Sequence, residues 1–207
     1  MYKEKKLIAV SLPRFFPGEA EAVGRLLNEG LETFHLRKPE SSEAEIRTFL
    51  QTLPPAFYPR IVLHDAFPLA GELGLKGVHL NRRNPAAPAG FRGSVSRSCH
   101  SVEELKACGG YEYVFLSPIF DSLSKTGYGS RFTAPALRAA AEAGLIDSHV
   151  IALGGMDWST IPQIEPYGFG GAAVLGALWQ DYAASRDTGA LLQRFRRLCD
   201  TLNKPGK

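Results

Sequence analysis

The chain has 207 residues, about the size of one ordinary domain and enough to bury a full hydrophobic core. Hydrophobic residues make up 44% of the chain and charged residues 22%, which is typical of a globular protein and excludes a disordered one. The net charge is only +3, with no basic run, so nucleic acid is not expected as a partner, whereas small anionic substrates fit a mildly positive protein.

Short apolar runs alternate with segments of helical periodicity along the whole chain. Each run is bounded by turn residues or ends in a polar group, as expected of buried strands. The eight predicted strands are residues 7–12, 33–36, 60–63, 77–80, 93–98, 113–116, 150–153 and 171–175. The predicted helices are residues 19–29, 41–53, 66–73, 133–143 and 158–167, with one more that begins at residue 101 and a last one from residue 178.

Local signals support several of these helix ends. Ser42 and Glu45 have the spacing of a capping box, and Gly30 follows the first helix as a stop. Pro162 falls in the first turn of its helix, where proline is tolerated. Residues 81–92 are rich in Pro, Ala and Arg and lack periodicity, so we expect an irregular loop where a helix is shortened or missing.

The order of the elements predicts the fold. Strands that alternate with helices indicate a parallel sheet with crossover helices, and eight such units predict closure into a barrel. The expected fold is therefore α/β, a single (β/α)8 TIM barrel, with one domain over residues 1–207. An open doubly wound sheet is the alternative, and the lack of a G-x-G-x-x-G motif after the first strand weighs against it.

The carboxyl ends of barrel strands carry the active site, which defines the first group of candidate residues. Arg37 and Lys38 follow the second strand, and Lys125 lies in the loop after the sixth, so three cations are expected at one mouth. Such charges favour a polyanion such as a diphosphate. Ser122 and Ser124 carry hydroxyls that can bind phosphate oxygens. Taken alone, that loop is equally consistent with a solvated surface segment.

Two further sites are expected at the same end of the barrel. Asp65 follows the third strand and could hold Mg²⁺, which commonly binds one or two carboxylates together with substrate phosphate. After the seventh and eighth strands, Gly155 and the backbone of Val174, Leu175 and Gly176 can cradle a phosphate monoester, although paired glycines also form simple tight turns. Two phosphate sites in one barrel favour an enzyme that joins two phosphorylated fragments.

An ordered series of stretches follows the predicted strand ends: FHLRKPE, VLHDAFPLA, GVHL, SRSCHS, YVFLSPIFDSLSK, VIALGGM and GAAVLGAL. In this order the series resembles the thiamine phosphate synthase and thiazole tautomerase superfamily, whose members are single (β/α)8 barrels of about this length. For the synthase, the resemblance implies that an aminopyrimidine diphosphate loses pyrophosphate to give a carbocation-like pyrimidine. The nitrogen of a thiazole phosphate then attacks it, which gives thiamine phosphate.

The resemblance also implies roles for individual residues. Diphosphate binding falls on Arg37, Lys38, Ser122, Ser124 and Lys125. Thiazole phosphate binding falls on Gly155, Val174, Leu175 and Gly176, and the serine near the pyrimidine falls on Ser98. The expected catalytic residues are Lys125, Arg37, Ser98 and His64, the last because it is the best placed of the strand-end histidines.

The sequence departs from the family pattern at the metal site. The family's asparagine–aspartate pair after the third strand is His64–Asp65 here, so Asp65 is kept as a Mg²⁺ ligand. Its Gly-Gln-Glu-Asp pattern after the fourth strand is replaced by Asn-Arg-Arg-Asn at residues 81–84, which leaves Asn84 as a neutral second ligand. Mg²⁺ is the expected cofactor, with lowered affinity, and the two added arginines could neutralise the diphosphate instead.

A transferase, thiamine phosphate synthase, is the leading prediction, and other functions stay open. A thiazole phosphate tautomerase would need only the monophosphate site and a base, but its histidine position carries Pro118 here. A non-catalytic binder of thiazole or thiamine phosphate would bind without turnover. A generic barrel aldolase or isomerase would need a buried Lys or Glu, for which the predicted strands offer no candidate.

The remaining expectations concern compartment and assembly. The apolar run at residues 7–12 is too short for a signal peptide, and no segment approaches the length of a membrane span. The 3 cysteines form no C-x-x-C motif and indicate neither a disulfide framework nor a zinc site. We therefore expect a cytoplasmic protein without membrane partners. Trp158, Tyr167 and the last helix are apolar enough to form a homodimer or to pack in the barrel's outer ring.

Overall fold

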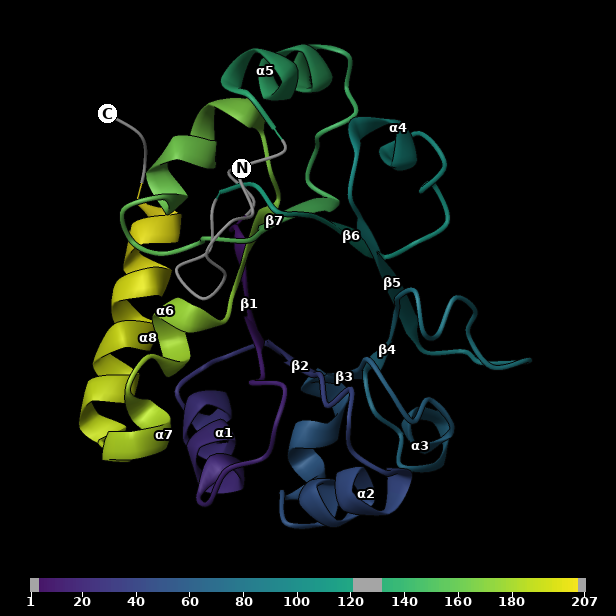
Figure 1. Cartoon of the computed structure of the whole chain (residues 1–207), viewed down its shortest axis with the longest axis vertical. Coiled ribbons are helices and arrows are strands. Elements are labelled where there is room, and N and C mark those ends of the chain that lie inside the picture. The colour runs from purple at the N-terminus through teal and green to yellow at the C-terminus, as the bar shows by residue number, and fades with distance from the viewer. Residues whose placement is uncertain (1–3, 121–131, 205–207) are drawn as a thin grey trace.

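The computed structural model describes residues 4–120 and 132–204, which form a closed barrel of parallel strands (Figure 1). The strands are β1 (Lys6–Val10), β2 (Thr33–Leu36), β3 (Ile61–Leu63), β4 (Gly77–Leu80), β5 (Ser94–Cys99), β6 (Tyr113–Leu116), β7 (Val150–Leu153) and β8 (Gly171–Val174). Each strand pairs with its successor, and β8 pairs with β1, with Ile8 opposite Ala173. The predicted (β/α)8 barrel is confirmed.

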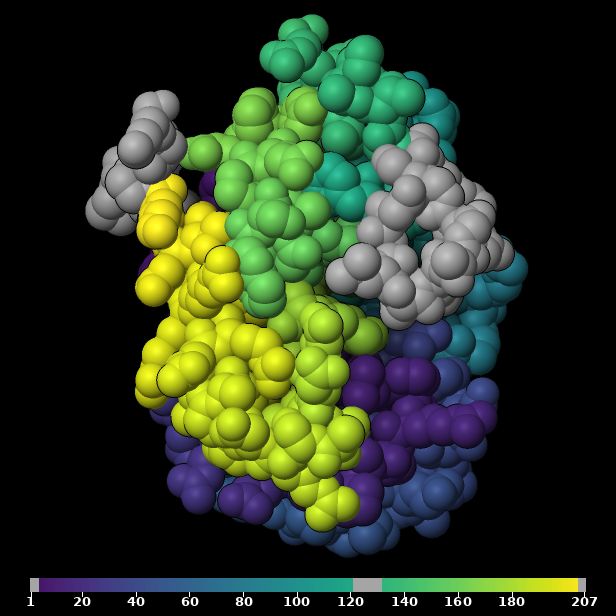
Figure 2. Space-filling model, turned by 60° about the vertical axis from the view of Figure 1, so that its left-hand side comes forward, coloured from purple at the N-terminus to yellow at the C-terminus, as the bar shows by residue number. Residues whose placement is uncertain are grey.

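Helices surround the barrel on the outside. They are α1 (Glu19–Asn28), α2 (Glu43–Gln51), α3 (Pro68–Glu72), α4 (Val102–Leu105), α5 (Ala134–Glu142), α6 (Gly176–Trp179), α7 (Tyr182–Ser185) and α8 (Thr188–Asn203), with 3-10 helices η1 (Pro55–Arg60) and η2 (Ile161–Tyr167). Helix α8 packs against α1, α6 and η2, and Figure 2 shows its surface in yellow beside the green segment that includes η2.

Several local predictions are confirmed, and others are corrected. Ser42 Oγ accepts from the backbone N–H of Glu45, and the Glu45 carboxylate accepts from the backbone N–H of Ser42, which is the predicted capping box. Residues 81–93, all described, contain no helix. In place of the predicted helix 158–167, the structure has the 3-10 helix η2, which begins only at Ile161 and contains Pro166. The predicted last helix is divided into α6, α7 and α8, because Asp181 and Arg186 have φ of 62° and 52°.

Side chains of the strands alternate between the barrel interior and the layer under the helices. On one side of the barrel, the inward positions are apolar: Ile8, Val10, Phe115, Ile151 and Ala173 pack together with Tyr113. The outward positions, such as Phe34, Leu36 and Leu63, pack in the larger core between strands and helices. On the other side, the inward positions of β2, β4 and β5 carry His35, His79 and Ser96, so the interior is polar there.

Contacts across the β1–β8 seam connect the two ends of the described chain. The indole N–H of Trp179 donates to the carbonyl of Val10 at 2.7 Å. The backbone N–H of Lys5 donates to Asn203 Oδ1 at 3.0 Å, across 198 positions of sequence. Among the described residues, no helix combines the length and the hydropathy that crossing a membrane would need.

Candidate active site

Arg37 lies at the carboxyl end of β2, where the backbone is held by a serine that directly follows the neighbouring strand β1. Its backbone N–H donates to Ser11 Oγ at 2.8 Å, and the same hydroxyl donates to its carbonyl at 3.1 Å. Ser11 is fully buried just after β1, whereas the side chain of Arg37 is half-buried. Burial lowers the pKa of Arg37, and the charge of Arg83 lowers it further, while Asp65 opposes both effects.

Lys38 does not join Arg37 at the mouth, which corrects its predicted role in diphosphate binding. Its side chain is fully buried, and Nζ donates to both carboxylate oxygens of Glu19 at 2.7 Å. Nζ also donates to the carbonyls of Leu12 at 2.9 Å and Arg14 at 3.1 Å. Burial lowers the pKa of Lys38 and raises that of Glu19, and their hydrogen bonds to each other oppose both shifts. The ammonium therefore anchors α1 to the loop after β2.

Asp65 joins the loops after β2 and β4. Its Oδ1 accepts from Arg83 Nη2 at 2.8 Å and Nε at 3.2 Å, and from Asn84 Nδ2 at 3.4 Å. Its Oδ2 accepts from the backbone N–H of Lys38 at 3.3 Å. The Asp65 side chain is only 13% exposed, whereas that of Arg83 is 43% exposed. A cation of the chain thus already occupies the carboxylate that was predicted to bind Mg²⁺.

Below the mouth, the barrel interior holds a hydrogen-bonded network of histidines. His35 Nδ1 lies 2.8 Å from His64 Nε2, and His35 Nε2 lies 2.6 Å from the Tyr113 hydroxyl. The rings of His64 and His79 stack with centroids 4.3 Å apart. Burial lowers the pKa of His35 and His64 well below the usual value, so both imidazoles are neutral near pH 7. A catalytic role for His64 stays a prediction.

His79 connects this network to Ser98. Its Nδ1 lies 2.9 Å from Ser96 Oγ and its Nε2 lies 2.9 Å from Ser98 Oγ. Burial lowers the pKa of His79 to about 3, so it too is neutral. Ser98, predicted to lie near the pyrimidine, is half-buried, and its hydroxyl is oriented by an imidazole ring.

The ligand atoms of His35, His64 and His79 lie within 4.8 Å of one another. Imidazoles suit transition metals and not Mg²⁺. The two nitrogens of His35, those of His79 and Nε2 of His64 are already engaged in hydrogen bonds.

The predicted monophosphate site lies where β7 and β8 end. Gly154 and Gly155 both have positive φ, and a Cβ on Gly154 would lie 2.8 Å from Pro118 Cα, so close packing requires this glycine. Leu175 and Gly176 follow β8, and α6 begins at Gly176. The N–H groups of Leu178 and Trp179 already donate to the carbonyl of Leu175, at 3.2 and 3.0 Å, so an anion here would bind N–H groups that precede them. Among the described residues, no atom lies within 4 Å of a Cβ placed on Gly176, so they leave space for a ligand beside this backbone.

Three predicted residues, Ser122, Ser124 and Lys125, lie outside the described residues.

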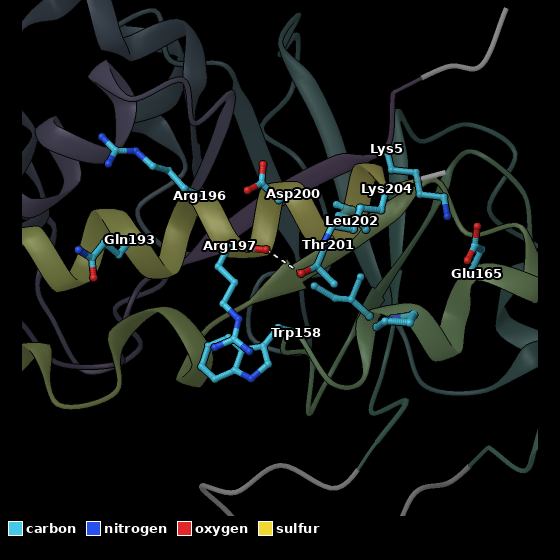
Figure 3. A pocket seen from close by; sticks show the side chains of 12 residues that line it. Lys5, Trp158, Glu165, Gln193, Arg196, Arg197, Asp200, Thr201, Leu202 and Lys204 are labelled. Atoms are coloured by element: carbon cyan, nitrogen blue, oxygen red, sulfur yellow. Dashed lines mark hydrogen bonds between the residues drawn. The ribbon is translucent and has the colours of Figure 1, made fainter. Parts of the chain in front are cut away.

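A groove of about 660 Å³ lies on the outer wall of the barrel, between η2 and α8 (Figure 3). Arg197 lies over the Trp158 ring with its Cζ 4.3 Å from the ring centroid. Lys5, which precedes β1, lines the groove together with Lys204 near the end of α8. This groove belongs to the helical layer and not to the carboxyl ends of the strands, so it does not compete with the mouth as the candidate active site. The predicted homodimer stays a prediction.

A family model described as thiamine monophosphate synthase matches residues 14–178. The chain belongs to this family. Among curated members, it is 28% identical to a putative thiamine-phosphate synthase of Geobacter sulfurreducens, with 79% of this chain and 80% of the relative covered. It is 26% identical to the thiamine-phosphate synthase of Levilactobacillus brevis, with 87% and 90% covered.

Solved structures extend the similarity to the thiamine monophosphate synthase family across the whole barrel. A thiamine phosphate pyrophosphorylase from Bacteroides thetaiotaomicron is 41% identical, with 98% of this chain and 100% of that chain covered, at a TM-score of 0.89. A thiamine phosphate pyrophosphorylase from Pyrococcus furiosus, 20% identical with a TM-score of 0.72 over 96% of this chain and 97% of that chain, shares the fold.

Sequence reasoning missed Ser11, the pairing of Arg83 with Asp65 and the network that joins Ser98 to the interior histidines. The alternation of side chains along a strand was the signal for the histidines, because His35 and His79 stand at inward positions. The same alternation places Arg37 on the inward side and Lys38 on the outward side, under α1. Nothing local marks Arg83 as the partner of Asp65, since that contact depends on how a loop of irregular structure folds.

Proposed function

We propose that the chain is a thiamine phosphate synthase. It couples 4-amino-2-methyl-5-pyrimidinylmethyl diphosphate with thiazole phosphate: the C–O bond to the diphosphate breaks, a C–N bond forms, and pyrophosphate leaves. The observation that carries this proposal is the family match over residues 14–178, which include the carboxyl ends of β2 to β8. As a transferase of this family, the chain acts on phosphorylated small molecules.

Charge at the mouth supports departure of pyrophosphate. The guanidinium of Arg37 lies close enough to Arg83 for the charge of Arg83 to lower its pKa. A fixed cation next to the leaving group stabilises the negative charge that develops there. Lys125, Ser122 and Ser124 remain predicted diphosphate ligands. Gly155 and residues 174–176 are the proposed anchor of the thiazole phosphate, through backbone N–H groups at the start of α6.

The neutral interior suits a carbocation-like pyrimidine. Imidazolium groups below the mouth would repel developing positive charge, and burial keeps all three interior histidines uncharged. His79 orients the Ser98 hydroxyl, whose oxygen lone pairs can face the pyrimidine. The tautomerase alternative is not favoured, because the family members reported above carry the name of the synthase or of its pyrophosphorylase synonym.

Product formation tests this proposal. The purified chain is mixed with the pyrimidine diphosphate and the thiazole phosphate, and thiamine phosphate is measured by thiochrome fluorescence. We expect product from the unmodified chain and a loss of about 100-fold or more in kcat/KM for Arg37→Ala, as for removal of one stabilising donor. Arg25→Ala, on the exposed face of α1, is the matched control and should keep full activity. Interconversion of thiazole phosphate tautomers without any product would contradict the proposal.

A further inference from the structure

The family resemblance implies Mg²⁺ at Asp65 and Asn84, and the residues present do not fit that ion. Mg²⁺ prefers six oxygens in near-octahedral geometry, usually with one or two carboxylates. Here Asp65 Oδ1 is bound by Arg83 through two N–H groups, and Asn84 turns its Nδ2 toward the same oxygen. Within residues 4–120 and 132–204, the one group of three or more candidate metal-binding side chains is the histidine trio, which contains no carboxylate.

Asp65 holds Arg83 in an orientation that suits an anion. The carboxylate binds the side of the guanidinium that contains Nε and Nη2, at 3.2 Å and 2.8 Å. In the part of the chain that the structure describes, Nη1 has no hydrogen-bond partner. A guanidinium held along one side presents its remaining N–H groups in a fixed plane, which is the geometry that binds phosphate oxygens in pairs.

The surroundings of Arg83 also favour an anion. Asp65 binds the backbone N–H of Lys38, the residue next to Arg37, so one carboxylate links the loops that carry both arginines. Lys38 is paired to Glu19, and the described charges that act on Arg37 are those of Arg83 and Asp65, so these three groups together are net positive. Two guanidinium groups with only one carboxylate near them are stabilised when a polyanion binds.

We propose that Arg83, held by Asp65, takes the place of the divalent cation, and that Arg37 and Arg83 bind the diphosphate without Mg²⁺. This inference rests on the proposed function for the identity of the ligand as a diphosphate. Asp65 is then a positioning residue for Arg83, and Asn84 contributes its Nδ2 hydrogen bond to Asp65. The guanidinium of Arg83 thus both excludes Mg²⁺ from Asp65 and neutralises the diphosphate in its place.

Calorimetric titration with inorganic pyrophosphate tests the proposal, in EDTA and in Mg²⁺. We expect the Kd of the unmodified chain to differ by less than about 3-fold between the two buffers, and Arg83→Met to weaken binding in EDTA at least 10-fold, about 1.4 kcal/mol. Arg83→Lys should recover only part of this affinity, because an ammonium cannot bind side-on. Arg92→Met removes the same charge from an exposed position that precedes β5 and should bind as the unmodified chain does.

A double variant, Arg83→Glu with Asn84→Asp, restores the acidic family pattern and should reverse the behaviour. Its binding of pyrophosphate should be weak in EDTA and rise at least 10-fold in Mg²⁺, since carboxylates then replace the guanidinium. Circular dichroism confirms that each variant is folded. Binding by the unmodified chain that requires Mg²⁺, or no binding in either buffer, would overturn the proposal.

Parallel assays of product formation separate this inference from the proposed function. If product forms but both activity and pyrophosphate binding require Mg²⁺, the synthase function stands and the role of Arg83 is wrong. If pyrophosphate binds through Arg83 in EDTA but no product forms with the two substrates, the arginine site stands and the synthase function is wrong.

Discussion

The polar groups inside the protein and those at the barrel mouth differ in how completely they are paired within the fold. Inside, Lys38 is bound by Glu19 and two carbonyls, and the interior histidines hydrogen-bond to one another and to hydroxyls. At the mouth, Arg83 pairs with Asp65 and is 43% exposed, and the half-buried Arg37 lies close enough for the charges of both to act on it. Groups that are paired within the fold serve stability, whereas unbalanced charge that faces solvent is free to bind a ligand. The difference teaches that adjacent cations such as Arg37 and Lys38 need not share a task.

Lowering the pH should have the largest effect, a loss in the free energy of unfolding caused by the interior histidines. The pKa of each interior histidine is lower in the folded protein than the value of about 6.5 in an unfolded chain, so the unfolded chain binds more protons as the pH falls below about 6.5. The contribution of these neutral histidines to the free energy of unfolding is fully present above about pH 6.5 and is lost progressively as the pH falls below it. Three such histidines lower the free energy of unfolding by up to about 4 kcal/mol for each unit by which the pH falls.

Urea unfolding at pH 7.5, 6.0 and 5.0 measures this loss. His149→Gln, at an exposed position, is the control for the replacement of a histidine as such. Equal free energies of unfolding at pH 7.5 and pH 5.0 would mean that the interior histidines are not held neutral by burial.

Lys38→Met should have the next largest effect, a loss of about 3–5 kcal/mol in the free energy of unfolding, because Glu19 is left buried without its partner. Lys38→Met combined with Glu19→Leu should recover most of that loss, since replacing a whole buried pair by apolar side chains is often neutral. Thermal and urea unfolding measure both variants. A single variant as stable as the unmodified chain would show that the pair is dispensable.

Tyr113→Phe should have a smaller effect within the interior. It removes the hydroxyl that lies 2.6 Å from His35 Nε2 and leaves that buried nitrogen unpaired, at a cost of about 1–3 kcal/mol. Tyr167→Phe, at a half-buried position on the outer wall, is the matched control and should change stability by less than about 0.5 kcal/mol. The same urea series compares the two, and equal stabilities would argue that the network contributes little.

Arg83→Met should change stability least, by no more than about 1 kcal/mol, because ion pairs with an exposed partner contribute little. Its affinity for pyrophosphate should nevertheless fall at least 10-fold, about 1.4 kcal/mol, as described above. Urea unfolding and calorimetry on the same preparation compare the two quantities. A large loss of stability with unchanged affinity would place Arg83 with the interior groups and remove the contrast between the two regions.

The barrel and its strand ends could be predicted from sequence because they depend on local patterns. Apolar runs and helical periodicity repeat along the chain, and Ser42 with Glu45 defines a helix start from four residues. The position of Lys38 could not be read from charge alone, since the outward side of β2 continues into a buried layer that contains Glu19. The Arg83–Asp65 pair lies beyond sequence reasoning, because it joins residues 18 positions apart through a loop without periodicity.

The pairing of β1 with β8 has a consequence for the order in which the strands can follow one another along the chain. The hydrogen bond from Lys5 to Asn203 places the two ends of the barrel side by side, while β8 pairs with β1 as any neighbouring strands do. The ring of strands therefore has no obligatory starting point. A circular permutant would join these ends by a short linker and open the chain within residues 85–90, which belong to no strand and no helix. We expect it to assemble the same barrel.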